Sequence, residues 1–399
     1  MDRTPAGRPR VRSLSGAQLR MRWLLGGGIT LLLAAGITLA LMPEPTTPVP
    51  SVGDIGAALG RRPQYSFAFP AEGTTPLERP VSVLSAPGRV YVVDSQAKAV
   101  RVFDDRGGER SVIGSGTLGV PVYAARDGKR GVLYVTDREK RTVFAFDDTD
   151  GSLIGTIAPQ PSTDDTRSAE ATAWAPLGID VAEDGTLWVS DVLSRHRVLE
   201  LEPDGTIVRE LGGARAAEEA TGVAVVLDYP NGVALSADEV WVSDSNNRRI
   251  VVFGRDGGFR RVLDVDALAR GMAFLPASAE TSSFVVVADA LAQDIAVWDL
   301  SGAVLGRFGG PGVAAGQLSF PNDIAASADG ERLYVADTGN RRIQVWTWVD
   351  AEKAPFGGVA GESDASGRVP YVAAAIVLGL LGIGLVVAAS WRPRVELRH

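Results

Sequence analysis

Short runs of β-branched and aromatic residues, each ending in an aspartate, recur along the middle of the chain. Such residues favour β-strands, and the glycines and polar residues between the runs are typical of tight turns. A second apolar run starts six or seven residues after each aspartate, and a run led by proline precedes most copies. The six copies are Val90–Asp94, Leu133–Asp137, Leu187–Asp191, Val240–Asp244, Val285–Asp289 and Leu333–Asp337.

The spacing of these copies predicts the fold class. Successive aspartates are 43 to 54 residues apart, and each unit reads as four strands joined by turns. Four strands every 45 residues or so are typical of a propeller blade, and six blades close a ring without open sheet edges. The sixth copy lacks an outer strand after Trp348, whereas Tyr65–Phe69 is a strand without a blade. We therefore predict an all-β six-bladed propeller over residues 64–350, closed by Tyr65–Phe69 as the outer strand of the last blade.

Two long uncharged runs flank the repeats. Trp23–Met42 has 20 residues and Pro370–Trp391 has 22, so each is long enough to cross a bilayer core of about 30 Å as a helix. Residues 1–22 carry a net charge of +5 and residues 392–399 a net charge of +2, which favours cytoplasmic termini. We predict a multi-pass protein of the cell membrane with an extracytoplasmic propeller. A cleaved signal peptide is the alternative for the first run.

Linkers join the propeller to these runs. Residues 43–63 are rich in proline and are expected to be semi-extended. Residues 351–369 form the second linker. Two polar inserts, 160–173 and 212–222, are expected to project from the face that carries the connections between blades.

Composition excludes several function classes. The chain has 399 residues, no cysteine and two histidines, one of them the final residue. Disulfides, thiolate metal sites, cysteine nucleophiles and histidine-rich metal centres are therefore excluded. Only His196 is available for a triad, and no Gly-x-Ser-x-Gly segment supplies a nucleophile. Residues 23–391 carry a net charge of −15, which disfavours nucleic acid as a partner. The composition fits a bacterial cell-surface protein.

Two of the copies resemble NHL repeats. They run from Phe320-Pro-Asn-Asp to Asn340-Arg-Arg-Ile and from Tyr229-Pro-Asn-Gly to Asn247-Arg-Arg-Ile. The resemblance implies the six-bladed propeller of that family and leaves the function open, because propellers host many roles. His196 stands where the family often has a histidine in its turn, and we interpret it as structural.

The recurring aspartates and arginines have distinct expected roles. We expect each aspartate to cap its turn by accepting backbone N–H groups; a ring of carboxylates for cations is the alternative. We expect the second arginine of each Asn-Arg-Arg segment, Arg249 or Arg342, to pair with a blade aspartate. The first, Arg248 or Arg341, is free to meet an anionic partner.

Aromatic residues near the same face complete a candidate binding patch. Aromatic and arginine side chains are enriched at the centres of interfaces. Trp174 is the better aromatic candidate because it follows a polar insert, whereas Tyr229 and Phe320 alternatively pack between blades. The candidate binding residues are Trp174, Tyr229, Asn231, Arg248, Arg249, Phe320, Asn322, Arg341 and Arg342.

A weaker resemblance supports an enzyme as the alternative. The segment Pro-Asn231-Gly-Val-Ala is similar to the metal-binding segment of gluconolactonase-type propellers. That resemblance implies a divalent ion, Ca²⁺, in the channel, held by Glu78, Asn231 and Asn322 with Asp180 or Asp323 as a further oxygen ligand. Oxygen ligands suit calcium, and the ion would act as a Lewis acid on a lactone carbonyl. The tryptophan that usually follows in the family's first segment is absent here.

These features predict a binding protein. The expected function is a non-catalytic extracytoplasmic binding or scaffold propeller, an accessory subunit of a membrane assembly. Its expected partner is a protein or a cell-wall polymer, and no cofactor is required. A calcium-dependent lactonase-like hydrolase and a ligand sensor are the two alternatives.

Overall fold

The computed structural model describes residues 52–160, 173–193, 195–212, 225–265, 268–275 and 283–351. Both predicted membrane spans and most of both polar inserts lie outside these residues. Among the described residues, no helix is long and apolar enough to cross a membrane.

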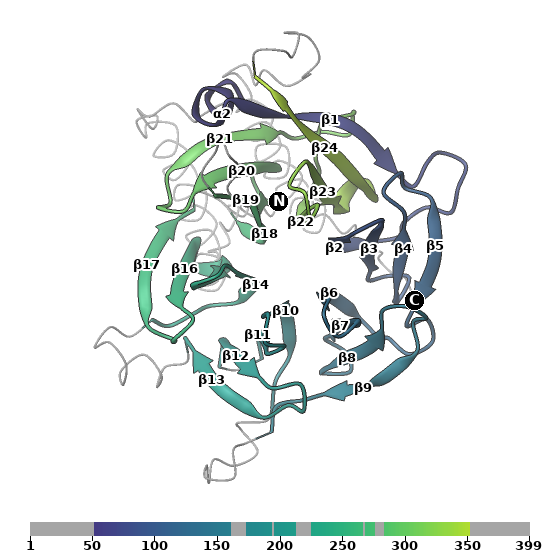
Figure 1. The fold of residues 1–399 in the computed structure, drawn as a ribbon, viewed down its shortest axis with the longest axis vertical. Coiled ribbons are helices and arrows are strands. Elements are labelled where there is room, and N and C mark those ends of the chain that lie inside the picture. Colours follow the sequence, from purple (N-terminus) through teal and green to yellow (C-terminus); the bar gives the residue numbers. More distant parts are fainter. Residues whose placement is uncertain are drawn as a thin grey trace, which may run out of the picture. The chain divides into compact units, whose positions relative to one another are not determined.

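The described strands form six four-stranded antiparallel sheets, which are the blades of a propeller (Figure 1). Blade one comprises β2 (Pro80–Ala86), β3 (Arg89–Asp94), β4 (Ala99–Phe103) and β5 (Glu109–Ile113). Blade two comprises β6 (Pro121–Asp127), β7 (Val132–Asp137), β8 (Thr142–Asp147) and β9 (Leu153–Ile157). Blade three comprises β10 (Pro176–Val181), β11 (Leu187–Asp191), β12 (Arg197–Leu201) and β13 (Ile207–Leu211).

The second half of the ring repeats this plan. Blade four comprises β14 (Pro230–Leu235), β15 (Glu239–Asp244), β16 (Arg249–Gly254) and β17 (Phe259–Asp264). Blade five comprises β18 (Ala269–Leu275), β19 (Phe284–Asp289), β20 (Asp294–Asp299) and β21 (Val304–Gly309). Blade six comprises β22 (Pro321–Ala326), β23 (Arg332–Asp337), β24 (Arg342–Asp350) and β1 (Arg61–Phe69). Two short 3₁₀ turns, η1 (Ser245–Asn247) and η2 (Thr338–Asn340), follow β15 and β23.

The first strand of each blade lies innermost, and the inner strands contact one another around the ring. The inner strand of blade six contacts that of blade one, so the ring is closed. We call the face where the second strands end at the six aspartates the upper face, and the opposite one the lower face. Each inner strand therefore begins at the upper face.

Closure depends on a strand from the start of the domain, as predicted. β1 pairs antiparallel with β24, from Arg61 opposite Asp350 to Phe69 opposite Ile343. Hydrogen bonds between the two ends of the domain thus hold the last blade together. The strand begins at residue 61, a few residues before the predicted start of the domain.

A helix precedes this strand, in the segment that the sequence analysis assigned to a linker. Helix α2 (Val52–Leu59) packs against β21 and β1. Its Ile55 is fully buried, and the Ala351 N–H donates to the Gly60 carbonyl at 2.9 Å. Segments from the two ends of the domain therefore lie side by side at the lower end of blade six.

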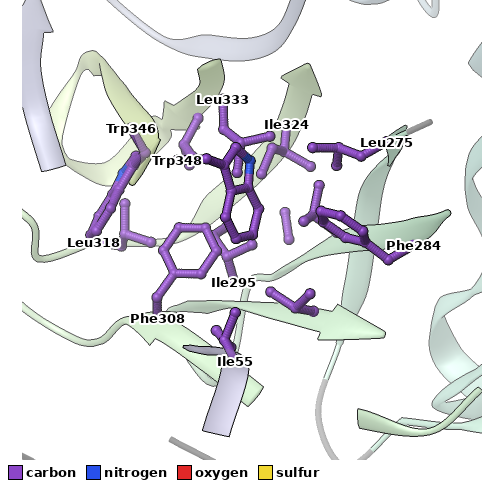
Figure 2. Packing of buried hydrophobic residues seen from close by; sticks show 14 residues of the cluster. Ile55, Leu275, Phe284, Ile295, Phe308, Leu318, Ile324, Leu333, Trp346 and Trp348 are labelled. Carbon is purple, nitrogen blue, oxygen red and sulfur yellow. The ribbon is translucent and has the colours of Figure 1, made fainter. Parts of the chain in front are cut away.

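The core lies between the blades. Most residues of the middle two strands are buried, because a neighbouring sheet covers each face. Figure 2 shows the cluster between blades five and six, where Phe308 lies 4.8 Å from Trp346 and Phe284 lies 5.2 Å from Trp348, measured between ring centroids. Ile55 of α2 joins this cluster, so the helix seals the outer side of the closing blade.

Candidate functional site

A buried aspartate ends the second strand of every blade and organises the upper face. Asp137 accepts the Gly119 N–H at 2.6 Å, and Asp337 accepts the Ser319 N–H at 2.7 Å. Each bond ties the loop that enters a blade to that blade's second strand. The predicted turn capping is confirmed in four blades, where the aspartate also accepts a backbone N–H two or three residues further on. Asp244 and Asp337 make no such bond, so the prediction is wrong for these two. The six aspartates, each at most 1% exposed, are Asp94, Asp137, Asp191, Asp244, Asp289 and Asp337.

The second arginine of each Asn-Arg-Arg segment pairs with the aspartate of its own blade, as predicted. Arg249 Nε lies 2.7 Å and Arg342 Nε 2.8 Å from the aspartate oxygen. Arg197 makes the same contact in blade three at 2.9 Å. These ion pairs are structural, which removes Arg249 and Arg342 from the set of free binding residues.

The residue before each of these arginines has a left-handed backbone. Arg248 and Arg341 have φ values of 52° and 56°, and both side chains are exposed. His196, with φ of 44°, holds the same place in blade three. Its Nδ1 accepts the Tyr229 N–H at 3.3 Å, a contact that agrees with a structural role.

Three polar side chains stand where the inner strands of blades four, five and six begin. The pairing with the second strand shifts register after the first residue of each of these inner strands. The second residues are Asn231, Arg270 and Asn322. Arg270 Nη1 donates to Asn231 Oδ1 at 3.2 Å, and Asn322 Nδ2 donates to the Val81 carbonyl of blade one at 2.5 Å. Consecutive blades therefore place an arginine between two asparagines at the mouth of the channel.

Glycines allow the inner strands to lie this close together. A Cβ on Gly232 would lie 2.4 Å from the Arg270 carbonyl oxygen, and one on Gly271 would lie 1.8 Å from Asp323 Oδ1. Ser243 Oγ also donates to the Arg270 carbonyl at 2.6 Å. The backbone that carries Arg270 is thus held from both sides.

A hollow of about 430 Å³, which we call the mouth pocket, opens on the upper face above this point. It is formed by blades five, six and one, and its volume falls in the range of small-ligand sites. Three arginines and one glutamate line it, together with Phe320, whose side chain is 55% exposed. The residues with functional side chains are Glu78, Arg79, Arg270, Phe320, Asn322 and Arg341, with Gln96 and Thr338 beside them.

Two carboxylates lie further along the inner strands. Asp323 accepts the Ser82 hydroxyl at 2.6 Å and the Val83 N–H at 3.1 Å, which links blade six to blade one. Asp180 accepts the Leu235 N–H at 2.9 Å, which links blade three to blade four. Burial raises the pKa of Asp323 to about 7 and that of Asp180 to about 6, because desolvation disfavours the charged form.

Two members of the proposed calcium set, Glu78 and Asn322, line the mouth pocket, whereas the other members are engaged in hydrogen bonds. Asn231 Oδ1 already accepts from the Arg270 guanidinium, and that cation repels a metal ion at the same place. Asp180 and Asp323 are used in hydrogen bonds between blades. Among the described residues, no group of three or more His, Cys, Asp or Glu is arranged to hold a metal ion. The lining of the mouth pocket is net positive, with three arginines and one glutamate.

The aromatic candidates separate into buried and exposed residues. Trp174 is 2% exposed and donates its indole N–H to the Arg141 carbonyl at 2.8 Å, so the expectation of a binding side chain is wrong. The insert beside it suggested exposure, but the ring packs between blades two and three. Tyr229 packs against the same cluster, whereas Phe320 is exposed at the mouth pocket.

The sequence analysis missed Arg79 and Arg270, which supply two of the three pocket arginines. In blade five, Arg270 of Ala269-Arg-Gly occupies the strand position that Asn231 of Pro-Asn-Gly occupies in blade four. Aligning the degenerate fifth copy with the fourth would have revealed it. Arg79 directly precedes the proline of β2, as Phe320 precedes that of β22.

Together these features define a six-bladed β-propeller with a ligand-sized pocket at its mouth. A family model of the NHL repeat matches residues 227–253 and 318–346, which cover most of blade four and the core of blade six. The chain is therefore a propeller that contains NHL repeats. A comparison with curated proteins finds no relative.

Solved structures with a similar fold include an auxiliary nutrient binding protein from Bacteroides thetaiotaomicron VPI-5482. It is 11% identical with a TM-score of 0.51, over 68% of this chain and 70% of that chain. A streptogramin B lyase is 15% identical with a TM-score of 0.48, over 73% and 99%. A catalytically inactive virginiamycin B lyase from Staphylococcus aureus, solved with quinupristin, is 14% identical with a TM-score of 0.47, over 72% and 99%. At these identities the likeness concerns the fold alone.

Proposed function

We propose that this protein is a non-catalytic binding module whose upper face binds a partner at the cell surface. The observation that carries this proposal is the mouth pocket, a hollow of about 430 Å³ lined by three arginines and an exposed phenylalanine. Two of these arginines, Arg79 and Arg341, make no side-chain hydrogen bond among the described residues. Exposed arginine and aromatic side chains around a concave centre are typical of binding surfaces.

Exposed apolar side chains extend this surface. Of the eleven large hydrophobic side chains exposed in the described part of the chain, six lie on loops of the upper face and five on outer strands. An apolar, partly cationic face supports a binding role more than a passive one. The six are Val120, Leu193, Val226, Leu291, Val313 and Phe320.

The direction in which the chain leaves the domain fits this role. β24 runs from the upper face to the lower face, and β1 starts beside its end. We propose that residues 23–42 and 370–391 are membrane anchors; the paired ends of the domain, Arg61 and Asp350, both lie at the lower face. The mouth pocket would then open away from the membrane, toward a protein or wall polymer.

Site-specific photo-crosslinking in intact membranes tests the proposal. A photoreactive amino acid replaces Leu291, which is 51% exposed beside the mouth pocket, or Ile154, which is 58% exposed on an outer strand. We expect a discrete adduct from position 291 and none from position 154. The same adducts from both positions, or none from position 291, would refute a binding role for the upper face.

A further inference from the structure

The charges of the mouth pocket indicate the class of its ligand. Three arginines and one glutamate line it, although residues 23–391 carry a net charge of −15. We infer that the mouth pocket binds a sugar-sized ligand that carries a carboxylate or phosphate group. This inference rests on the proposed function, because it names the chemistry that the upper face recognises.

Two of the pocket arginines keep all their side-chain donors for a ligand. Arg79 and Arg341 are exposed, and within the described residues neither side chain makes a hydrogen bond or ion pair. This contrasts with Arg342, one residue further along, which pairs with Asp337 and also donates to two loop carbonyls at 2.8 Å. A guanidinium fork matches a carboxylate or phosphate in shape and charge.

Arg270 adds a third, positioned cation. Its Nη1 donates to Asn231 at 3.2 Å, whereas its Nε is buried without a hydrogen-bond partner. The buried Nε is out of reach of a ligand, so the available donor is Nη2, which makes no hydrogen bond among the described residues, and Arg270 belongs to the pocket lining. The hydrogen bond to Asn231 already restrains this side chain, which lowers the conformational entropy that it loses when it meets an anion.

Phe320 defines the part of the ligand next to the anionic group. Its φ of 48° lies in the left-handed region, which bulky residues rarely adopt. Its side chain is nevertheless 55% exposed at the pocket, so the strained backbone presents an aromatic face to solvent. Tyr229 has the same backbone conformation in blade four, but its ring packs against the core. The exposed Phe320 ring can contact the apolar face of a sugar ring. A sugar acid or sugar phosphate has such a face beside its anionic group, and therefore fits the mouth pocket.

Calorimetric titration of the purified full chain in mild detergent tests this inference. The probes are glucuronate, glucose 6-phosphate and uncharged glucose, with calcium chloride as a separate titration. The test variant is Arg341→Asn, and the matched control is Arg141→Asn, at the equivalent turn of blade two and outside the pocket lining. Both arginines are exposed with left-handed φ, and asparagine tolerates that conformation well, so the two variants share the same charge change and backbone strain.

We expect the wild type and Arg141→Asn to bind one of the two anions with the same affinity. Arg341→Asn should bind it about 10-fold more weakly, the equivalent of losing one charge-assisted hydrogen bond. Tighter binding of glucuronate identifies a carboxylate, and tighter binding of glucose 6-phosphate a phosphate. No anion binding, equal binding of glucose, equal losses in both variants, or stoichiometric calcium binding at the mouth would each overturn the inference.

This result is separable from the test of the proposed function. Adducts from position 291 without anion binding would leave the binding module intact and reject only the ligand class. Anion binding without adducts would retain the pocket chemistry and reject a macromolecular partner on this face.

Discussion

The buried aspartate of blade six allows a quantitative test of what holds the upper face together. Asp337 accepts the Ser319 N–H at 2.7 Å, Arg342 Nε at 2.8 Å and Gln344 Nε2 at 2.8 Å, and it is fully buried. Among the described residues, Asp137 accepts only backbone N–H groups, at 2.6 to 3.1 Å. Replacing Asp137 therefore measures the cost of losing a charged hydrogen-bond acceptor. Replacing Asp337 adds the cost of leaving the Arg342 guanidinium without its carboxylate.

We expect Asp337→Asn to destabilise the protein more than Asp137→Asn. Losing charge-assisted hydrogen bonds at residue 137 should cost about 1.5 kcal/mol. Breaking an ion pair with a buried partner costs about 3–5 kcal/mol. For Asp337→Asn we expect a loss of about 3 kcal/mol, the lower limit of this range. The Arg342 side chain is 20% exposed and still donates hydrogen bonds to two loop carbonyls. At roughly 2–4 °C per kcal/mol, the Tm of Asp337→Asn should lie about 3–6 °C below that of Asp137→Asn.

Thermal unfolding followed by circular dichroism on the full chain measures this difference. Adding Arg342→Gln to Asp337→Asn should restore part of the loss, because it removes the orphaned charge, and contacting residues show coupling of about 0.5–3 kcal/mol. Equal Tm values for the two single variants, or strictly additive effects in the double variant, would contradict the reasoning.

Two further predictions concern the junctions that close the ring. Because the pKa of Asp323 is raised to about 7, its contribution to stability is greatest when it is protonated and declines between about pH 4 and pH 7, at roughly 1.4 kcal/mol per unit at most. Asp323→Asn should therefore flatten the dependence of Tm on pH from 5 to 7.5, and parallel wild-type and variant profiles would disprove this. Ile55→Ala should lower the free energy of unfolding by about 2–4 kcal/mol, because Ile55 is fully buried between blades five and six. In the same denaturation assay the control Val313→Ala, at a side chain 76% exposed, should leave the midpoint unchanged.

The repeat pattern in the sequence already determined the architecture. A β-strand pattern that ends in aspartate six times predicts six blades, because each unit buries its faces only against neighbouring units. The strand without a blade predicted closure by β1, and the recurring arginine predicted the ion pairs of Arg249 and Arg342. These predictions depend on local pattern and on periodicity, both of which are written along the chain.

Only the tertiary structure decided which side chains share a site. Glu78, Arg270 and Arg341 are far apart in sequence, and closure of the ring brings blades five, six and one together around the mouth pocket. The same packing buries Trp174 and exposes Phe320, although both are aromatic residues near the start of an inner strand. Exposure at these positions depends on the shape of the adjacent blade, and no local pattern encodes that shape.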